Sequence, residues 1–144
     1  SADKLARARE LGADFGVSHH DADWEQQIAK WTGKPGADLV VDGVGGETWQ
    51  KCAALLRAGG RVVSYGATSG LATIDLRRLF WRHLDVLGST MGSERDFDEL
   101  LALLNAGTWK PLVDTVQPLD EISAALARME HNQHMGKIVL KIRK

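Results

Sequence analysis

Short, uninterrupted apolar runs constrain the fold of this chain more than any other feature. They lie at residues 15–18 (FGVS), 38–42 (DLVVD), 60–66 (GRVVSYG) and 84–89 (LDVLGS), with helical patterns between them. Apolar runs that do not alternate with polar residues are typical of parallel strands covered on both faces by helices. Strands that alternate with helices predict an α/β domain with a mostly parallel sheet.

Amphipathic helical patterns separate these runs and continue after them. Two weaker patterns lie at about residues 4–11 and 24–31. Three clear patterns, with apolar residues at i, i+3, i+4 and i+7, consist of Trp49, Cys52, Ala53 and Leu56; of Phe97, Leu100, Leu101 and Leu104; and of Ile122, Ala125, Leu126 and Met129. Glycines follow the patterns at the positions expected of helix ends, namely Gly12, Gly33, Gly59 and Gly107.

The last third of the chain has a different pattern. Ser93, followed three residues later by Asp96, predicts a capped helix start, because a short oxygen side chain can accept from a free backbone N–H there. The runs at residues 112–117 and 137–142 alternate between apolar and polar side chains. They therefore predict strands of a second layer that is exposed on one face.

Ligands of an open parallel sheet bind beyond the carboxyl ends of its strands. The segments to consider are therefore residues 43–46, 66–70 and 89–92, which are rich in glycine and small hydroxyl residues. Residues 43–48 lack the third glycine of the G-x-G-x-x-G phosphate fingerprint, and the next strand ends without the acid that accompanies it. The first segment is therefore predicted to contact a sugar or ring rather than to hold a pyrophosphate.

Two other interpretations of residues 38–48 remain open at this stage. The segment can be a tight connection from strand to helix without any ligand. It also resembles the acid-x-Gly-x-Gly motif of methyltransferases that bind S-adenosylmethionine. That motif lies on the first strand and requires an acid at the end of the next strand, and the sequence meets neither condition.

Five blocks occur in the order and spacing of the medium-chain dehydrogenase/reductase superfamily, and the chain resembles its zinc-type alcohol dehydrogenase and quinone oxidoreductase branches. The blocks are DKLARARELGAD, DLVVDGVGGETW, LRAGGRVVSYGATSG, LDVLGSTMGS and VQPLDEISAALARMEHNQHMGKIVL. The resemblance implies a Rossmann-like, three-layer α/β domain with a mostly parallel sheet, here lacking the first two strands and the glycine-rich phosphate loop. Residues 1–110 would form this partial NAD(P)-binding domain. Residues 111–144 would form a C-terminal segment that packs back toward the catalytic domain.

The same resemblance implies that the chain is the C-terminal part of a longer enzyme. An N-terminal catalytic domain, with any zinc ligands, would precede residue 1, and the two absent strands would lie between those at 15–18 and 38–42. The enzyme would be a homodimer that pairs through the strand at 84–90. It would move hydride between NAD(P)H and an alcohol, carbonyl, enone or quinone, and we expect the 144 residues alone to be inactive. A non-catalytic dimerisation or assembly module is the alternative from a different class.

The resemblance also implies cofactor contacts at individual positions. Ser1 and Lys4 match the loop around the 2′-phosphate of NADP, which favours NADP over NAD. The remaining positions are Asp42, Gly43 and Val44 at the ribose, Gly66 and Ala67 at the nicotinamide half, Ser89, Thr90 and Met91 at the carboxamide, and Lys137 at the pyrophosphate. Lys4 and Lys137 also have simpler interpretations, as a solvated lysine at a helix start and as an edge-strand lysine that discourages aggregation.

Charge and hydropathy argue against several other classes of protein. Eighteen basic and nineteen acidic residues leave a net charge of −1, without a block of five or six like charges, so no nucleic-acid partner is expected. The basic and aromatic segment at 77–83 (RRLFWRH) is instead predicted to be a helix near the cofactor mouth. No apolar run reaches the length of about 18 residues that a membrane span requires, so no membrane partner is predicted.

Cysteine and histidine residues are too few to predict a metal site. The single cysteine, Cys52, lies on a helical apolar stripe, so it is predicted to pack in the core, and it fits a reducing cytoplasm. The pairs His19 and His20, and His131 and His134, do not complete a set of four zinc ligands. Zinc is therefore not expected within this chain.

Overall fold

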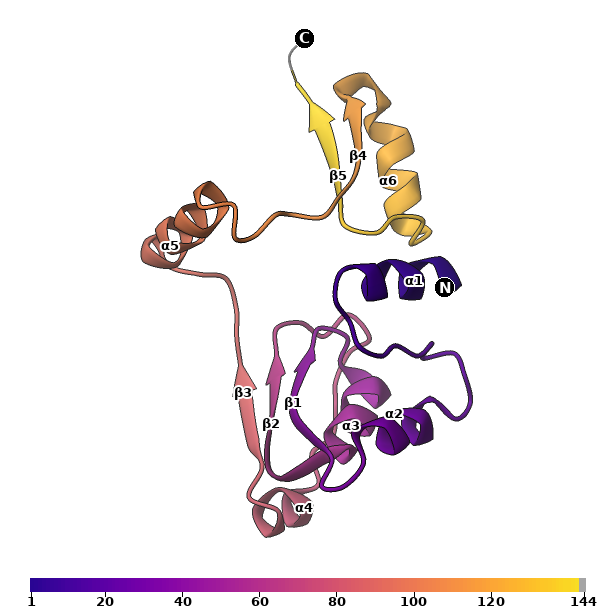
Figure 1. The fold of residues 1–144 in the computed structure, drawn as a ribbon, viewed down its shortest axis with the longest axis vertical. Helices are drawn as coiled ribbons and strands as arrows, with labels where there is room; N and C mark the ends of the chain where they lie inside the picture. Colours follow the sequence, from indigo (N-terminus) through magenta and orange to yellow (C-terminus); the bar gives the residue numbers. More distant parts are fainter. Residues whose placement is uncertain (143–144) are drawn as a thin grey trace. The chain divides into compact units, whose positions relative to one another are not determined.

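The computed structural model describes residues 1–142, which form two compact units divided between Met91 and Gly92 (Figure 1). Each unit has its own parallel sheet. The boundary that the sequence predicts, between residues 110 and 111, concerns the domains of a longer enzyme and stays a prediction.

Residues 1–91 form the first unit, in which helices alternate with the strands of a three-stranded sheet. Its elements are α1 (Ala2–Glu10), α2 (Trp24–Thr32), β1 (Ala37–Asp42), α3 (Gly46–Ala54), β2 (Leu56–Ser64), α4 (Leu76–Trp81) and β3 (Asp85–Gly88). The strand order is β1-β2-β3 and both pairs are parallel. This arrangement confirms the α/β class that the sequence predicts.

The core of this unit lies between α3 and one face of the sheet (Figure 1). Trp49 on α3 is 6% exposed, and Leu56 and Val62 on β2 are each 1% exposed. The indole N–H of Trp49 donates to Ser64 Oγ at 2.7 Å, so the polar atom of this buried ring is satisfied. Burial of each such side chain stabilises the fold by about 1.5–3 kcal/mol. This cluster therefore supports the two strands that lead to the candidate site.

The opposite face of the sheet is open. Leu39 and Val41 on β1 are 53% and 62% exposed, whereas Val40 between them is partly buried. Successive strand residues point to opposite faces, so α3 covers the face of Val40 and leaves the other uncovered. The helix cover that the sequence predicts for both faces is present on one face of β1, because the principal contacts of β1 are with β2 and α3.

Residues 15–18 do not form a strand, contrary to the sequence prediction. The segment runs irregularly between α1 and α2, and the ring of Phe15 stacks on that of Trp31 with 5.3 Å between centroids. A strand needs a neighbour for its backbone N–H and C=O groups, and β1 pairs with β2 alone among the described strands. The ring of Phe15 therefore packs on helix α2 instead.

The beginning of β2 also differs from the predicted helix end. Leu56, predicted to close a helical stripe, is the first residue of β2, because α3 ends at Ala54. Gly59, predicted to stop the helix, has a left-handed φ of 69° where the register between β1 and β2 shifts. Its N–H donates to the carbonyl of Arg82 at 2.8 Å. The glycine therefore belongs to a bulge in the strand rather than to a helix end.

Residues 92–142 contain helix α5 and a β-α-β motif. Their elements are α5 (Glu94–Asn105), β4 (Val113–Pro118), the 3-10 helix η1 (Leu119–Glu121), α6 (Ile122–Glu130) and β5 (Lys137–Lys141). β4 and β5 pair in parallel, and their side chains range from exposed to partly buried, as predicted for a half-exposed layer. The predicted helix start is confirmed as a capping box, in which Ser93 and Asp96 each accept from the other's backbone N–H. Such a cap stabilises a helix by about 1 kcal/mol.

Arg128 of α6 connects β4 to the loop between α6 and β5. Its guanidinium donates to Asp114 Oδ2 at 2.7 Å, to Thr115 Oγ1 at 3.1 Å and to the carbonyl of Gln133 at 2.9 Å. The backbone N–H of Met135 donates to the second oxygen of Asp114 at 3.0 Å. The Met135 N–H, followed by the Arg128 side chain, holds the pKa of Asp114 below its ordinary value.

We expect residues 92–142 to lose stability in acid through Asp114. The folded-state pKa of this carboxyl group lies below its ordinary value of 3.8, so its contribution is complete at neutral pH and is lost as the pH falls below roughly 5. Asp114→Asn should therefore reduce the loss of stability between about pH 6 and pH 3. Urea unfolding followed by NMR signals of β4 and β5 measures this loss. Asp120→Asn is the control and should keep the parent's pH dependence, whereas an unchanged profile for Asp114→Asn would contradict the assignment.

Candidate functional site

Three turns meet at the carboxyl edge of the β1-β2-β3 sheet. We define the first turn as residues 43–46, the second as 66–70 and the third as 89–91. The parallel register aligns the strand ends, because Asp42 lies opposite Ser64 and Ser64 lies opposite Gly88. The structure therefore brings together the predicted site residues of all three turns, as expected for a parallel sheet.

The side chain of Asp42, at the end of β1, stabilises the first turn. This residue is 5% exposed, and its Oδ2 accepts from the backbone N–H of Gly45 at 2.9 Å. Its carbonyl accepts from the N–H of Tyr65 at 2.9 Å, which continues the ladder to the second turn. The carboxylate thus fixes the shape of the turn, and its contact with a ribose stays a prediction.

The first and second turns lie directly against each other. The N–H of Ser69 donates to the carbonyl of Val44 at 2.7 Å, and the N–H of Gly46 donates to that of Gly70 at 3.2 Å. A Cβ added to Gly45 would lie 2.6 Å from the Gly70 oxygen, and Gly45 has a positive φ of 75°. Glycine is therefore required at position 45 both for conformation and for space.

Tyr65 is a site residue that the sequence analysis did not identify. Its ring lies beside Gly43, because a Cβ added to that glycine would be 2.7 Å from Cζ of the ring, and 64% of the tyrosine remains exposed. The side chain therefore forms an exposed aromatic surface next to the first turn. The sequence could have identified Tyr65, because an aromatic residue directly before Gly66 at a strand end is expected at the carboxyl edge of the sheet.

The third turn continues the edge beyond β3. The N–H of Ser89 donates to the carbonyl of Ser64 at 2.9 Å, which places this residue beside the end of β2. Thr90 and Met91 follow as exposed residues, and Met91, 99% exposed, has a left-handed φ of 51°. The predicted contact of residues 89–91 with a carboxamide stays a prediction.

The three remaining predicted contact residues lie outside these turns. Ser1 is the N-cap of α1, and its Oγ accepts from the N–H of Lys4 at 3.4 Å. Lys137 begins β5 in the second unit, where its N–H donates to the carbonyl of Leu112 at 2.8 Å. The first contact caps α1, and the second fixes the backbone at the start of β5. The expected contacts of these residues with cofactor phosphates stay predictions.

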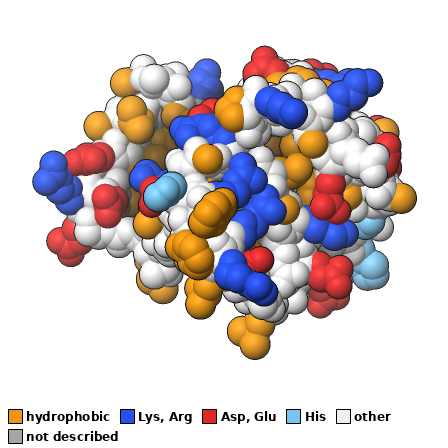
Figure 2. Space-filling model, turned by 90° about the horizontal axis from the view of Figure 1, so that it is seen from below, with side chains coloured by type: hydrophobic (Ala, Val, Ile, Leu, Met, Phe, Trp, Pro, Cys, Tyr) orange, Lys and Arg blue, Asp and Glu red, His pale blue; other side chains and the backbone are white. Residues whose placement is uncertain are grey.

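The sequence predicts that the basic and aromatic segment at residues 77–83 lies near the cofactor mouth. The structure instead places this segment away from the carboxyl edge of the sheet. Helix α4 leads into the amino end of β3, and the carbonyl of Arg82 accepts from Gly59 near the beginning of β2. Both strands start at this end of the sheet, opposite the three turns. Phe80 and Trp81 are 64% and 77% exposed at this end. Figure 2, viewed from below, shows hydrophobic and basic side chains next to one another on the surface.

Cys52 is partly buried on α3. Burial, followed by the negative charges of Asp42 and Glu25, raises the pKa of its thiol. Because the thiolate is the reactive form, we expect iodoacetamide near neutral pH to alkylate Cys52 roughly tenfold more slowly in the folded chain than in urea. Mass spectrometry measures the two rates, and equal rates would contradict this environment.

Two negative findings hold for residues 1–142. No group of three or more His, Cys, Asp or Glu side chains in this range is arranged to hold a metal ion. In the same range, no helix combines the length and apolar character needed to span a membrane.

Known proteins resemble this chain over almost its whole length. Residues 11–140 match the family described as zinc-binding dehydrogenase. The zinc-type alcohol dehydrogenase-like protein YogA of Leptosphaeria maculans is 32% identical over 150 residues, which cover 99% of this chain and 42% of that protein. The 2-dehydro-3-deoxy-L-galactonate 5-dehydrogenase of Pseudoalteromonas atlantica is 34% identical over 137 residues, which cover 93% and 40%. The crystal structure of an NAD-dependent alcohol dehydrogenase superposes with a TM-score of 0.88 and 36% identity, covering 99% of this chain and 42% of that one.

These comparisons establish the family rather than a complete activity. The chain spans about two fifths of the length of these relatives. The match covers most of the chain, and the Rossmann-like α/β fold is shared with the alcohol dehydrogenase structure. The chain therefore belongs to the zinc-binding dehydrogenase family, within the medium-chain dehydrogenase/reductase superfamily.

Proposed function

We propose that this chain binds part of a nicotinamide dinucleotide in an oxidoreductase that moves hydride between NAD(P)H and an alcohol, carbonyl, enone or quinone. The observation that carries the proposal is the row of three turns at the carboxyl edge of one parallel sheet. Glycines at positions 43, 45 and 66 add no side chains of their own to this edge. Backbone groups can then approach a flat ligand closely.

The residues of the three turns would bind and orient the cofactor, which itself supplies the hydride chemistry. In this proposal Asp42, Gly43 and Val44 lie along the ribose. Gly66 and Ala67 face the nicotinamide half, and residues 89–91 meet the carboxamide. Tyr65 adds an aromatic wall beside the ribose. The zinc ligands and the proton donor would lie in a catalytic domain outside this chain.

We further propose that the chain prefers NADP to NAD. The Ser1 hydroxyl and the Lys4 ammonium suit a 2′-phosphate, since charge-assisted hydrogen bonds to phosphate are strong. The NAD-dependent relative supports a dinucleotide in general. Lys4→Gln should weaken NADPH binding about fivefold, equivalent to ~1 kcal/mol, and leave NADH binding almost unchanged.

Calorimetric titration of the 144-residue chain tests the proposal. NADPH should give saturable heat and NADH weaker heat, while S-adenosylmethionine should give none. Absence of heat with both dinucleotides would contradict cofactor binding by this chain. Saturable heat with S-adenosylmethionine alone would favour the methyltransferase interpretation. Turnover of NADPH with a quinone or aldehyde by these residues would contradict the expectation that they are inactive alone.

Self-association through β3 is a second candidate function, and one observation favours it. β3 is the last strand in the order β1-β2-β3, and all four of its residues are exposed. An unpaired strand edge readily pairs with another chain. Sedimentation should therefore reveal a dimer that Leu87→Lys weakens. A monomer at all concentrations would exclude this function and leave the cofactor proposal untouched.

A further inference from the structure

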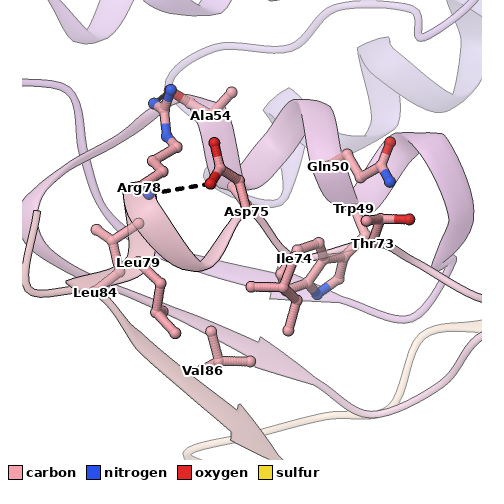
Figure 3. A pocket seen from close by; sticks show the side chains of 11 residues that line it. Trp49, Gln50, Ala54, Thr73, Ile74, Asp75, Arg78, Leu79, Leu84 and Val86 are labelled. Atoms are coloured by element: carbon pink, nitrogen blue, oxygen red, sulfur yellow. Dashed lines mark hydrogen bonds between the residues drawn. The ribbon is translucent and has the colours of Figure 1, made fainter. Parts of the chain in front are cut away.

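Tyr65 directly follows β2, and its side chain points to the open face of the sheet. The residue before it, Ser64, points to the covered face, because its Oγ accepts from the indole N–H of Trp49 on α3 at 2.7 Å. On β3, Val86 points to the same covered face, where it lines a pocket with Trp49 (Figure 3). Successive strand residues point to opposite faces. The Tyr65 side chain therefore lies on the face that α3 leaves uncovered.

The ring of Tyr65 reaches across to Gly43 of the first turn. A Cβ added to Gly43 would lie 2.7 Å from Cζ of the ring and 2.8 Å from the hydroxyl oxygen. The outer end of the tyrosine therefore occupies the space that a side chain at position 43 would take. Gly43 has no left-handed φ, so glycine is required at this position for space and not for conformation.

The Tyr65 hydroxyl is the polar side-chain group that the first turn leaves available to a ligand. Within residues 1–142, no other group forms a hydrogen bond with it, and 64% of the residue is exposed. The nearby carboxylate of Asp42 is in a different situation, because this residue is 5% exposed and its Oδ2 accepts from the N–H of Gly45. A phenol hydroxyl can donate as well as accept, so it suits the hydroxyl groups of a sugar.

The inference rests on the proposed function, in which the ribose lies along the first turn and the nicotinamide half along the second. Tyr65 links these two places, because it directly precedes Gly66 and reaches Gly43. We infer that the Tyr65 hydroxyl forms a hydrogen bond with the ribose next to the nicotinamide, and that Gly43 leaves the space through which the ring reaches it. The 2′-phosphate lies on the other half of NADP, so this contact should favour NADPH and NADH equally.

Tyr65→Phe tests this contact, because it keeps the ring and removes the hydroxyl alone. It should weaken calorimetric binding of both NADPH and NADH by the 144-residue chain about fivefold, the effect of one lost hydrogen bond. Reduced nicotinamide mononucleotide, which has this ribose but no adenosine, should show the same loss.

Three outcomes of these titrations would contradict the inference. Unchanged affinity for NADPH in Tyr65→Phe would overturn it and leave the proposed function standing. A loss confined to the dinucleotides would place the hydroxyl at the adenosine half, and so would also overturn it. No binding of either dinucleotide by the parent chain would overturn the inference together with the proposed function.

The role of Gly43 is tested by combining substitutions. In Gly43→Ala the new Cβ meets the outer end of a flexible side chain, so the chain should fold with the tyrosine displaced. Adding Tyr65→Phe should then change NADPH affinity less than twofold. Gly88→Ala is the matched control, since a Cβ there meets nothing within 4 Å, and in that background Tyr65→Phe should still cost about fivefold. A fivefold loss in both backgrounds would show that the contact does not depend on Gly43.

A measurement without ligand tests the geometry even if Gly43→Ala does not fold or does not bind. Nuclear Overhauser effects should connect the Hα atoms of Gly43 with the ring protons at position 65, both in the parent chain and in Tyr65→Phe. The Hα atoms of Gly88 should show no such effect, because no side chain lies within 4 Å of a Cβ built there. Absence of the Gly43 effect in the folded parent chain would overturn the inference.

Discussion

Leu56→Ala is expected to lower the free energy of unfolding of residues 1–91 by about 3 kcal/mol. The Leu56 side chain is 1% exposed and packs with Trp49 and Val62. Truncation removes buried surface and leaves a cavity between a strand and a helix that cannot close without moving backbone. This loss reduces the folding equilibrium constant roughly hundredfold. Urea unfolding, followed by the amide signals of β1, β2 and β3, measures it.

Leu71→Ala is the matched control for this substitution. The Leu71 side chain is 100% exposed, so its removal should change the free energy of unfolding by less than about 0.5 kcal/mol. Similar losses at the two positions would mean that the packing between α3 and β2 does not determine the stability of this unit.

Gly45→Ala is expected to remove NADPH binding and to destabilise residues 1–91 by about 3 kcal/mol. The backbone at position 45 has a φ of 75°, and the added Cβ would lie 2.6 Å from the carbonyl oxygen of Gly70. The Gly70 oxygen belongs to the backbone and the position of the Cβ is fixed by the backbone, so neither atom can move without separating the first two turns. Calorimetry with NADPH and urea unfolding provide the two measurements.

Gly107→Ala separates the conformational cost from the steric one. Gly107 has a φ of 68°, and a Cβ there would meet nothing within 4 Å. We expect the free energy of unfolding of residues 92–142 to fall by about 1 kcal/mol from the backbone conformation alone. NADPH binding should be unchanged. If Gly45→Ala proved no worse than Gly107→Ala in stability, close approach of the two turns would not be essential to the fold.

The main strands and the site edge could be predicted because both depend on local patterns. The apolar runs at 38–42, 60–66 and 84–89 define three strands, and parallel pairing then places the turns after them at one edge. The capping box at Ser93 and Asp96 is equally local. Such features follow from the periodicity of side chains and from the chemistry of helix starts.

The features that the sequence did not predict depend on partners distant along the chain. Residues 15–18 have strand-like composition, but no described strand lies beside them, and Phe15 packs on Trp31 instead. The role of Tyr65 depends on the close approach of Gly43, and the place of α4 depends on where β3 begins. Neither is visible in hydrophobic periodicity, which reports burial and does not identify neighbours.

The hydrogen bond between Trp49 and Ser64 gives the chain an intrinsic spectroscopic reporter. Three of the other tryptophans are 47–77% exposed, namely Trp31, Trp81 and Trp109. Trp49 is shielded from solvent, and its N–H is bound to the residue directly before Tyr65. Rearrangement of the second turn must therefore alter the polarity around this indole. In a variant whose other four tryptophans are replaced by phenylalanine, the position of the Trp49 emission maximum would follow that change without an attached dye.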